Sequence, residues 1–528
     1  MSDSALVEGL TPVAIWPRTR IEAAVPFAIF GGVFLLLWLL YGNRLILGTN
    51  DEGIYLDAAE RILHGQKPYV DFFGYMSPGS FWMQALAFRL FGMTLAAGRV
   101  LVLFYLALEC ALIYWLVERY ASRAAAIVTA LFFLAFQTAD PSMLTAQHRW
   151  DSGAFALASI AICVGAQSES RRRWLVASGV LIAAAAVATP SVALVAMVTL
   201  AWLAWPAGRR GRAAWYLLGL SAAGAALIGV LWSSRMLAPL LQQIFWLSRN
   251  YAANNAMPYG AIIGGYGALF EGAGALELLV RSCVVFCVAL PAILPVVALA
   301  GGGLFWVRRK SDSQPLRTVI PYLLLCVVAL VASTYPRSDV AHLAWVSALP
   351  YAVTGILLSH LLPSRARSWL AIWIAVWATV FALQGQRSGR GTLLNTPVGE
   401  VRASAAEAPL VAELLSRVQP GQSLFVFPYK PLFYFLTQAT NPTRYSYLEA
   451  GMMTNEDARL ALSELEARPP EWVLYMDLDQ SEFARVFPGG KRLNPHYPQL
   501  ESWIKANYRA AGVPSLGGYV LLQRTIAK

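Results

Sequence analysis

Residues 97–117 read AGRVLVLFYLALECALIYWLV, an apolar run whose charged residues are Arg99 and Glu109. A helix needs about 20 mostly apolar residues to cross the hydrocarbon core of a bilayer. This run therefore predicts a membrane-spanning helix, and similar runs follow along most of the chain. We expect about eleven spans by this rule, at 23–41, 97–117, 123–139, 150–167, 174–188, 190–206, 214–233, 277–306, 318–334, 341–362 and 368–384.

The composition agrees with a polytopic α-helical membrane protein. Of the 528 residues, 57% are hydrophobic and 13% are charged, whereas globular chains carry about 25% charged residues. So little polar surface excludes a water-soluble body, a disordered chain and a disulfide-rich secreted scaffold. All five cysteines fall inside apolar runs, so we predict neither disulfides nor a CxxC-type metal site.

The net charge of +11 arises from short basic clusters between the apolar runs. Such clusters orient cytoplasmic loops, so we predict no nucleic-acid partner. The stretch from Trp174 to Pro206 is either one long helix or a hairpin broken near Thr189-Pro190. Basic clusters at 171–173 and 209–212 flank it, and clusters on one side require an even number of crossings. We therefore predict the hairpin, a retained first helix without a cleaved signal, a cytoplasmic N-terminus and an outer C-terminus.

Two outer segments have a pattern of their own. The first outer loop, 48–96, predicts two surface helices, one capped by Asn50 and a second at Phe81–Phe91. Residues 1–384 then form a transmembrane domain, and 385–528 form a small extracytoplasmic α/β domain. Its expected strands are Ser423–Phe427, Trp472–Tyr475 and Tyr519–Leu522.

Three polar clusters lie on the predicted outer face. The first contains Asp51 and Glu52, which either complement a helix dipole or provide a carboxylate that acts as a base or binds a metal. The second contains His148 and Arg149, and the alternative to a functional role is a polar turn beside an interfacial Trp.

The third cluster, Tyr335–His342, contains Arg337, Asp339 and His342. A snorkelling arginine paired with an aspartate would explain two of these three residues without any function. Together, however, the clusters place guanidinium, imidazole and carboxylate groups on separate loops of one face. Guanidinium groups bind phosphate strongly, so we predict a site for a phosphate-bearing lipid in the outer leaflet. We find no nucleotide-binding loop and no serine-hydrolase or H-E-x-x-H motif.

This pattern resembles the GT-C superfamily of membrane glycosyltransferases, which includes protein O-mannosyltransferases and bacterial aminoarabinose and RgtA-type transferases. The resemblance covers most of the chain. It is carried by the spans, by Tyr335–His342, by Asp51-Glu52, Gly65-Gln66-Lys67-Pro68-Tyr69 and Ser77-Pro78-Gly79 of the first loop, and by Phe427-Pro428-Tyr429-Lys430-Pro431, Tyr434–Thr437 and Asn441–Tyr445 near the C-terminus.

The resemblance implies transfer of a sugar from a polyprenyl-phosphate donor to a lipid, glycan or protein acceptor on the extracytoplasmic face, with inversion. It implies Asp51 as the general base, with Glu52 supporting it or binding a metal. By their placement, Arg337 and Arg149 are our candidates for the donor phosphate. His342 and Asp339 would orient that site or help to hold a metal, and His148 completes it.

In one respect the chain departs from the aminoarabinose transferases. They carry an acidic residue shortly before a Pro-Pro pair, where this chain has Gly74-Tyr75-Met76-Ser77-Pro78 and, at a different offset, Asp71. A divalent cation therefore stays an open question, no metal ligand is assigned, and no nucleotide cofactor is expected.

Three alternatives remain from the sequence. A lipid-glycan ligase or polymerase would use a diphosphate-linked donor at a similar site. A polyprenyl-lipid transporter or flippase would use buried charges such as Glu109. A non-catalytic receptor would leave the loop clusters unexplained. Because the chain has no N-x-S/T sequon and resembles bacterial members, we expect a multi-pass protein in the bacterial inner membrane.

Overall fold

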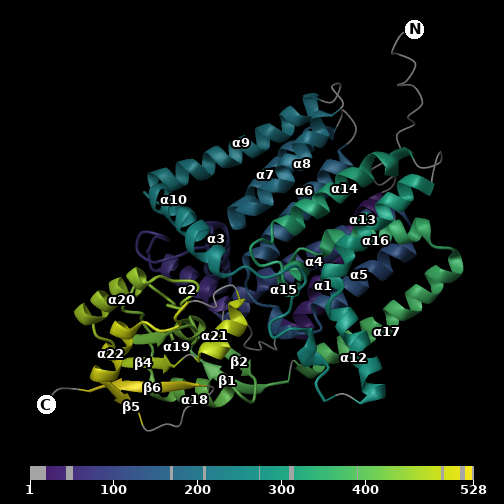
Figure 1. Ribbon diagram of the computed structural model, residues 1–528. Coiled ribbons are helices and arrows are strands. Elements are labelled where there is room, and N and C mark those ends of the chain that lie inside the picture. Colours follow the sequence, from purple (N-terminus) through teal and green to yellow (C-terminus); the bar gives the residue numbers. More distant parts are fainter. Residues whose placement is uncertain are drawn as a thin grey trace.

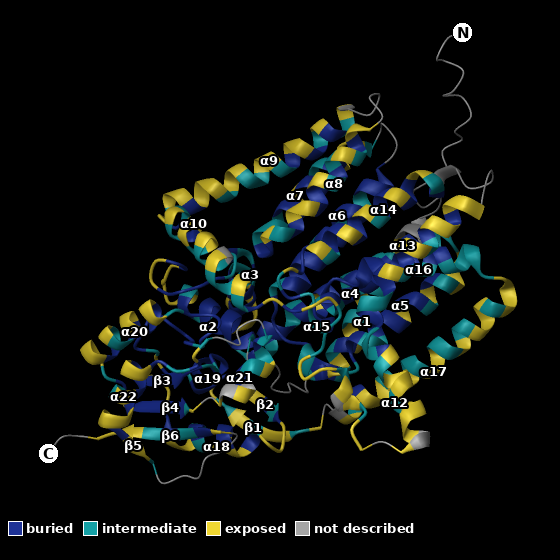
Figure 2. Ribbon diagram, in the orientation of Figure 1, coloured by how far each residue is buried: buried dark blue, intermediate teal, exposed yellow. Residues whose placement is uncertain are grey.

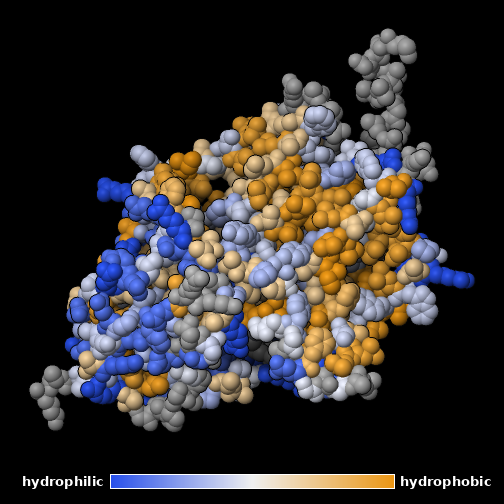
Figure 3. Space-filling model, viewed as in Figure 1, coloured by the Kyte–Doolittle hydropathy of each residue, from blue (hydrophilic) through white to orange (hydrophobic). Residues whose placement is uncertain are grey.

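A computed structural model describes residues 20–42, 51–166, 171–205, 210–272, 274–308, 314–388, 390–477, 479–488, 493–511 and 518–525. Figure 1 shows a large helical region beside a smaller region near the C-terminus that contains the strands. Hydrophobic side chains cover much of the helical region, whereas hydrophilic ones gather on the smaller region (Figure 3). This division matches the change of composition along the sequence.

Five of the described helices are long and apolar enough to cross a membrane: Ala24–Gly42, Leu95–Tyr120, Gly211–Ser233, Leu290–Arg308 and Ser364–Arg387. Shorter apolar helices lie among them at Arg123–Gln137, Trp174–Ala188, Pro190–Ala204, Leu316–Ala332 and Ala348–Leu361. The protein therefore has the helices of a multi-pass membrane protein.

Helix α4 (Leu95–Tyr120) lies at the centre of the helical region. It packs against α1 (Arg20–Leu37), α5 (Arg123–Gln137), α6 (His148–Gly165) and α16 (Ala348–Leu361). Figure 2 shows that α4, α5 and α6 are largely buried, while α9 (Arg210–Ser233) and α17 (Ser364–Ser388) expose many residues on the flanks. The exposed residues of these flanking helices include Trp232 and Trp369, so the flanks present an apolar surface suited to lipid.

The chain turns back at Thr189-Pro190, as the charge pattern predicts. Helix α7 (Trp174–Ala188) ends there, and α8 (Ala193–Ala204) follows the short turn Pro190–Val192. Ser178 in α7 bonds Ser159 in α6, and Thr189 bonds His148 at the start of α6, so α7 runs antiparallel to α6. Proline lacks the N–H that would continue the helix, which explains the break.

Two predicted spans are divided in the structure. The expected span 277–306 consists of α12 (Ala275–Val288) and α13 (Leu290–Arg308), and 341–362 consists of α15 (Val340–Trp345) and α16. Pro291 and Pro350 stand in the first turns of α13 and α16, where a missing N–H costs no hydrogen bond. Both breaks lie within continuous apolar sequence, so hydropathy alone does not predict them.

The first loop forms two helices, α2 (Glu52–Leu63) and α3 (Pro78–Phe91). The second begins at Pro78, three residues before the predicted Phe81, because a proline suits the first turn of a helix. Asn50, the predicted cap of the first helix, lies outside the described residues. Both helices lie where the helical region meets the C-terminal region (Figure 1).

The C-terminal region contains a β-hairpin and a four-stranded sheet. The hairpin joins β1 (Thr392–Thr396) and β2 (Gly399–Ala403). The sheet has the order β3-β4-β6-β5, with β3 (Leu424–Phe427) parallel to β4 (Trp472–Met476), and β6 (Tyr519–Arg524) antiparallel to both β4 and β5 (Tyr508–Ala510). Its helices are α18 (Ala408–Arg417), α19 (Leu432–Thr437), α20 (Asn455–Ala467), α21 (Gln480–Val486) and α22 (Pro498–Asn507). The three expected strands lie in this sheet as β3, β4 and β6.

Candidate active site

Helix α2 is fixed in place by the C-terminal region, and this contact positions Asp51 at its start. A Cβ atom built on Gly53 would lie 2.0 Å from the backbone nitrogen of Leu432, so α2 and α19 meet backbone to backbone. Two side-chain bonds extend the contact: Ser446 donates to Asp57, and Arg61 donates to the carbonyl of Thr443 over 3.3 Å. Asp51 therefore faces the C-terminal region although both belong to distant parts of the sequence.

The carboxylate of Asp51 accepts a hydrogen bond from the phenol of Tyr429. Burial, and next the charge of Asp51, raise the pKa of Tyr429, so its phenol keeps the proton that it donates. Further tyrosines surround this pair: Tyr75 stacks on Tyr251 at 5.1 Å between ring centroids, and Tyr447 meets Tyr429 edge-on at 5.8 Å. Asp51 thus lies partly exposed beside an aromatic wall.

Glu52 points away from this wall and is wholly buried. Its two oxygens accept hydrogen bonds from Arg99 at 2.9 Å and 2.7 Å, and one of them also accepts from the backbone of Ala146 at 3.2 Å. Buried charges are stable when they are paired in this way. In the structure Glu52 anchors α2 to α4 through Arg99, and its expected role in supporting Asp51 or binding a metal stays a prediction.

The third cluster forms a connected group around Arg337. The Nε atom of Arg337 donates to Asp339 over 3.4 Å, and its Nη1 atom donates to the side-chain oxygen of Asn255 over 3.4 Å. Asp339 caps α15 by accepting from the backbone of His342, and it also contacts the Nδ1 atom of His342 at 2.9 Å. The arginine–aspartate pair that would explain this cluster without a function is therefore present, but Asn255 and His342 add to it.

The second cluster lies next to the third. Arg149 is buried and donates to the carbonyl of Ser333 over 3.2 Å, while its Nε atom has no hydrogen-bond partner among the described residues. His148 contacts Thr189 at 2.6 Å and stacks against Tyr55 of α2. Electrostatic interactions link Arg149 with Asp339, and His148 with His342. The structure thus brings the residues of all three clusters to one end of the helical region.

These residues do not form a group of side chains spaced to bind a metal ion. Both oxygens of Glu52 are bonded to Arg99, Asp339 is bonded to Arg337 and His342, and exposed Asp71 accepts from the backbone of Lys67 at 2.6 Å. Within the described residues, the group spaced for a metal is Asp477, His496 and Glu501 in the C-terminal region. Among the described residues, the predicted site residues form no group with this spacing, so we derive no step through a metal.

The structure adds four residues to this site that had no role assigned from the sequence. They are Tyr251 and Asn255 from the segment before α12, and Tyr429 and Glu449 from the C-terminal region. Burial raises the pKa of Glu449 to about 8; repulsion from Asp51 adds to this shift and attraction to Arg337 opposes it. The run Phe427–Pro431, which carries part of the family resemblance, includes Tyr429. Tyrosine, asparagine and glutamate are common in loops, however, so their presence alone does not indicate a functional role.

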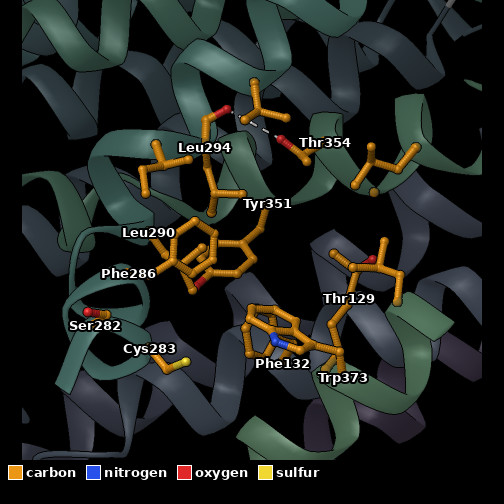
Figure 4. A pocket seen from close by; sticks show the side chains of 16 residues that line it. Thr129, Phe132, Ser282, Cys283, Phe286, Leu290, Leu294, Tyr351, Thr354 and Trp373 are labelled. Atoms are coloured by element: carbon orange, nitrogen blue, oxygen red, sulfur yellow. Dashed lines mark hydrogen bonds between the residues drawn. The ribbon is translucent and has the colours of Figure 1, made fainter. Parts of the chain in front are cut away.

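An apolar cavity of about 560 Å³ lies among α5, α12, α13, α16 and α17 (Figure 4). Phe132, Phe286, Leu290 and Trp373 contribute to its lining, and Tyr351 brings a hydroxyl that has no partner among the described residues. The start of α13 connects this cavity with the third cluster. Tyr259 donates to the carbonyl of Ala292 in α13 over 2.7 Å, and the next residue, Gly260, donates to the carbonyl of Ser338 over 2.8 Å.

Comparisons with solved structures identify the fold. ArnT from Cupriavidus metallidurans, solved bound to undecaprenyl phosphate, has a TM-score of 0.58 at 14% identity, over 96% of this chain and 99% of that chain. The oligosaccharyltransferase AglB from Archaeoglobus fulgidus, in complex with an inhibitory peptide and a dolichol-phosphate, has a TM-score of 0.52 at 11% identity, over 96% of this chain and 75% of that chain.

No family model matches the sequence, and no curated protein matches it either. ArnT and AglB are both GT-C superfamily members, and the similarity extends over nearly the whole of this chain. The chain therefore has the GT-C fold, which its resemblance to that superfamily implies.

Proposed function

We propose that this protein is a glycosyltransferase that moves a sugar from a polyprenyl-phosphate donor to an acceptor hydroxyl. The proposal rests on one observation: Asp51 lies at the same end of the helical region as Arg149 and Arg337, the arginines of the other two clusters. The GT-C fold supports it, since proteins of this fold have been solved with undecaprenyl phosphate and dolichol-phosphate.

In this mechanism Asp51 is the general base. As the acceptor oxygen attacks the anomeric carbon, its proton passes to the carboxylate of Asp51. The bond between the anomeric carbon and the phosphate oxygen breaks, and its electron pair leaves with the carrier phosphate. A single displacement of this kind inverts the anomeric configuration, and the sugar–phosphate bond supplies the driving energy without a nucleotide.

The arginines have the complementary task. The leaving phosphate gains negative charge, and guanidinium groups stabilise such charge most where water is excluded. Arg337 and Arg149 are both buried, and the Nε atom of Arg149 is free to donate among the described residues. Asp339, His342 and His148 orient them.

The apolar cavity would hold the isoprenoid tail of the carrier. Tyr259 donates to the carbonyl of Ala292 in the α13 wall, and the next residue, Gly260, donates to the carbonyl of Ser338 beside Arg337. A tail in this cavity and a phosphate at Arg337 would thus belong to one molecule. In this proposal the N-terminus is cytoplasmic, residues 385–528 form an extracytoplasmic α/β domain, and the membrane is a bacterial inner membrane.

The test is transfer of radiolabelled sugar from a panel of polyprenyl-phosphate sugars in membranes that contain the full chain. We expect Asp51→Asn to lower the rate about 10²–10⁴-fold at normal protein levels, the usual effect of losing a general base. Asp71→Asn, in the same loop but exposed, is the matched control and should keep full activity. Full transfer by Asp51→Asn would refute the assignment of the base.

A further inference from the structure

We propose that Glu449 of the C-terminal region binds the carrier phosphate beside Arg337, donating a hydrogen bond from a protonated carboxyl group. The inference rests on the proposed function and deepens it, because it gives the region after Thr392 a direct part in donor recognition. Neither the sequence pattern nor the resemblance to known proteins assigned Glu449 a role.

One chain of contacts leads from Glu449 to Asp51. The backbone N–H of Leu448 donates to the carbonyl of Pro428 over 2.7 Å, which holds the segment before Glu449 against Pro428. The next residue after Pro428 is Tyr429, whose phenol bonds Asp51. Glu449 is thereby fixed near the proposed base.

A second chain of contacts leads from Glu449 to Arg337. The side-chain amide of Asn255 donates to the carbonyl of Gly451 over 2.8 Å, and the oxygen of the same side chain accepts from Arg337. The backbone N–H groups of Met452 and Met453 both donate to the carbonyl of Glu449, at 3.0 Å and 2.8 Å, so a tight turn joins the two contacts. The segment that carries Glu449 is therefore held beside Tyr429 on one side and beside Asn255 on the other, and its carboxyl group interacts electrostatically with both Asp51 and Arg337.

The side chain of Glu449 is not used by the protein itself. It is partly exposed, and its carboxyl group has no hydrogen bond or ion pair among the described residues. Arg337, by contrast, is already bonded to Asp339 and Asn255. A carboxyl group held in place from both sides but left without a partner is available to a ligand.

The surroundings of Glu449 favour its neutral form at neutral pH, chiefly because burial disfavours the charged carboxylate. Burial raises the pKa of Glu449 to about 8, Asp51 raises it further and Arg337 lowers it. Among the described residues, the titratable groups that interact with it also include the phenols of Tyr429, Tyr497 and Tyr519, each with a pKa raised by burial and thus uncharged. A neutral carboxyl group donates a hydrogen bond to phosphate, whereas a carboxylate would repel it and would not act as a donor.

Because only the neutral carboxyl group donates to phosphate, binding should depend on pH. Below pH 8 the carboxyl group keeps its proton and the phosphate binds. Above pH 8 the proton must be recovered for binding, so affinity should fall by up to about tenfold per pH unit. The phosphate itself is fully ionised above about pH 7 and adds no further change in this range.

Calorimetric titration of farnesyl phosphate into the detergent-solubilised full chain at pH 7.5 to 9.5 tests the proposal. For the wild type we expect the Kd to rise about 10–30-fold over this range. Glu449→Gln keeps a neutral donor without a titrating proton, so its Kd should stay constant. Glu456→Gln, an exposed glutamate on α20 paired with Arg459, is the matched control and should behave as the wild type.

Further variants separate a binding role from a folding role and from the proposed function. Glu449→Asp retains a titrating group, so it should bind more weakly but with a pH dependence. Asp51→Asn should lose transfer yet keep pH-dependent binding, with the midpoint shifted to lower pH because a neighbouring negative charge is gone. A wild-type Kd that is independent of pH, or a Glu449→Gln protein that keeps the wild-type dependence, would overturn the proposal.

Discussion

Tyr429 donates a hydrogen bond to Asp51, although 378 residues separate the two in the sequence. The backbone carbonyl of Tyr429 in turn accepts a bond from the phenol of Tyr519 in strand β6. The sheet of the C-terminal region is thus connected to the proposed catalytic base through two bonds. Orientation of this carboxylate therefore depends on the C-terminal region and not only on the membrane helices.

Replacement of Tyr429 by phenylalanine tests that dependence. A hydrogen bond to a charged group contributes about 1.5–3 kcal/mol, so we expect kcat to fall about 10–100-fold while KM for the donor changes little. Sugar transfer at saturating donor provides the measurement. Tyr335→Phe, whose parent residue is exposed, is the control, and an unchanged kcat in Tyr429→Phe would show that the bond does not orient the base.

Gly53→Ala tests the close contact between α2 and α19. The added Cβ atom would lie 2.0 Å from the nitrogen and 2.4 Å from the Cα atom of Leu432, so the two helices must separate. Overpacking of this kind costs about 1–3 kcal/mol, and the shift also displaces Asp51. We expect a lower Tm and a strong loss of transfer.

The control for that substitution is Gly224→Ala in α9, where no atom lies within 4 Å of the added Cβ. Alanine is a better helix former than glycine, by about 0.5–1 kcal/mol, so this variant should be at least as stable as the wild type. Equal behaviour of the two alanine variants would contradict the tight α2–α19 contact.

Much of the helical region follows from hydrophobic runs, because a bilayer demands about 20 apolar residues per crossing. Positive charge at both ends of Trp174–Pro206 also sufficed to predict the hairpin that the structure contains. The breaks before Pro291 and Pro350 were missed because they occur within continuous apolar sequence, where hydropathy does not change. The local sequence pattern predicts the length and polarity of a helix, but it does not predict the packing that divides one helix into two.

The site was predictable to a lesser degree. Sidedness alone placed Asp51, Arg149 and Arg337 on one face, and the structure brings these residues together. Tyr429 and Glu449 reach the same place through contacts of the C-terminal region, which no spacing in the sequence encodes. An acidic residue next to Asp51 indicated that Glu52 supports the base or binds a metal. The pairing of Glu52 with Arg99 could not be predicted, because it depends on the packing of α2 against α4.

Glu52→Gln distinguishes an anchoring ion pair from a metal ligand. The substitution leaves the buried guanidinium of Arg99 without its counter-charge, a loss that costs about 3–5 kcal/mol. We expect a lower Tm that added divalent cations do not restore. The double variant Glu52→Gln/Arg99→Met should recover part of the stability, because it removes the stranded charge; recovery by a cation in the single variant would instead favour a metal site.

Glu109 in the middle of α4 separates the transferase from a transporter. This residue is 1% exposed, and neither carboxyl oxygen has a hydrogen-bond partner among the described residues. A buried polar group without a partner costs about 1–3 kcal/mol, so Glu109→Leu should raise the Tm by a few degrees, and Glu109→Gln should raise it less. The proposed reaction does not use Glu109, and sugar transfer by both variants should equal that of the wild type. A transporter would depend on such a buried ionisable group, so loss of activity in a stable Glu109→Leu protein would favour movement of the lipid over transfer of its sugar.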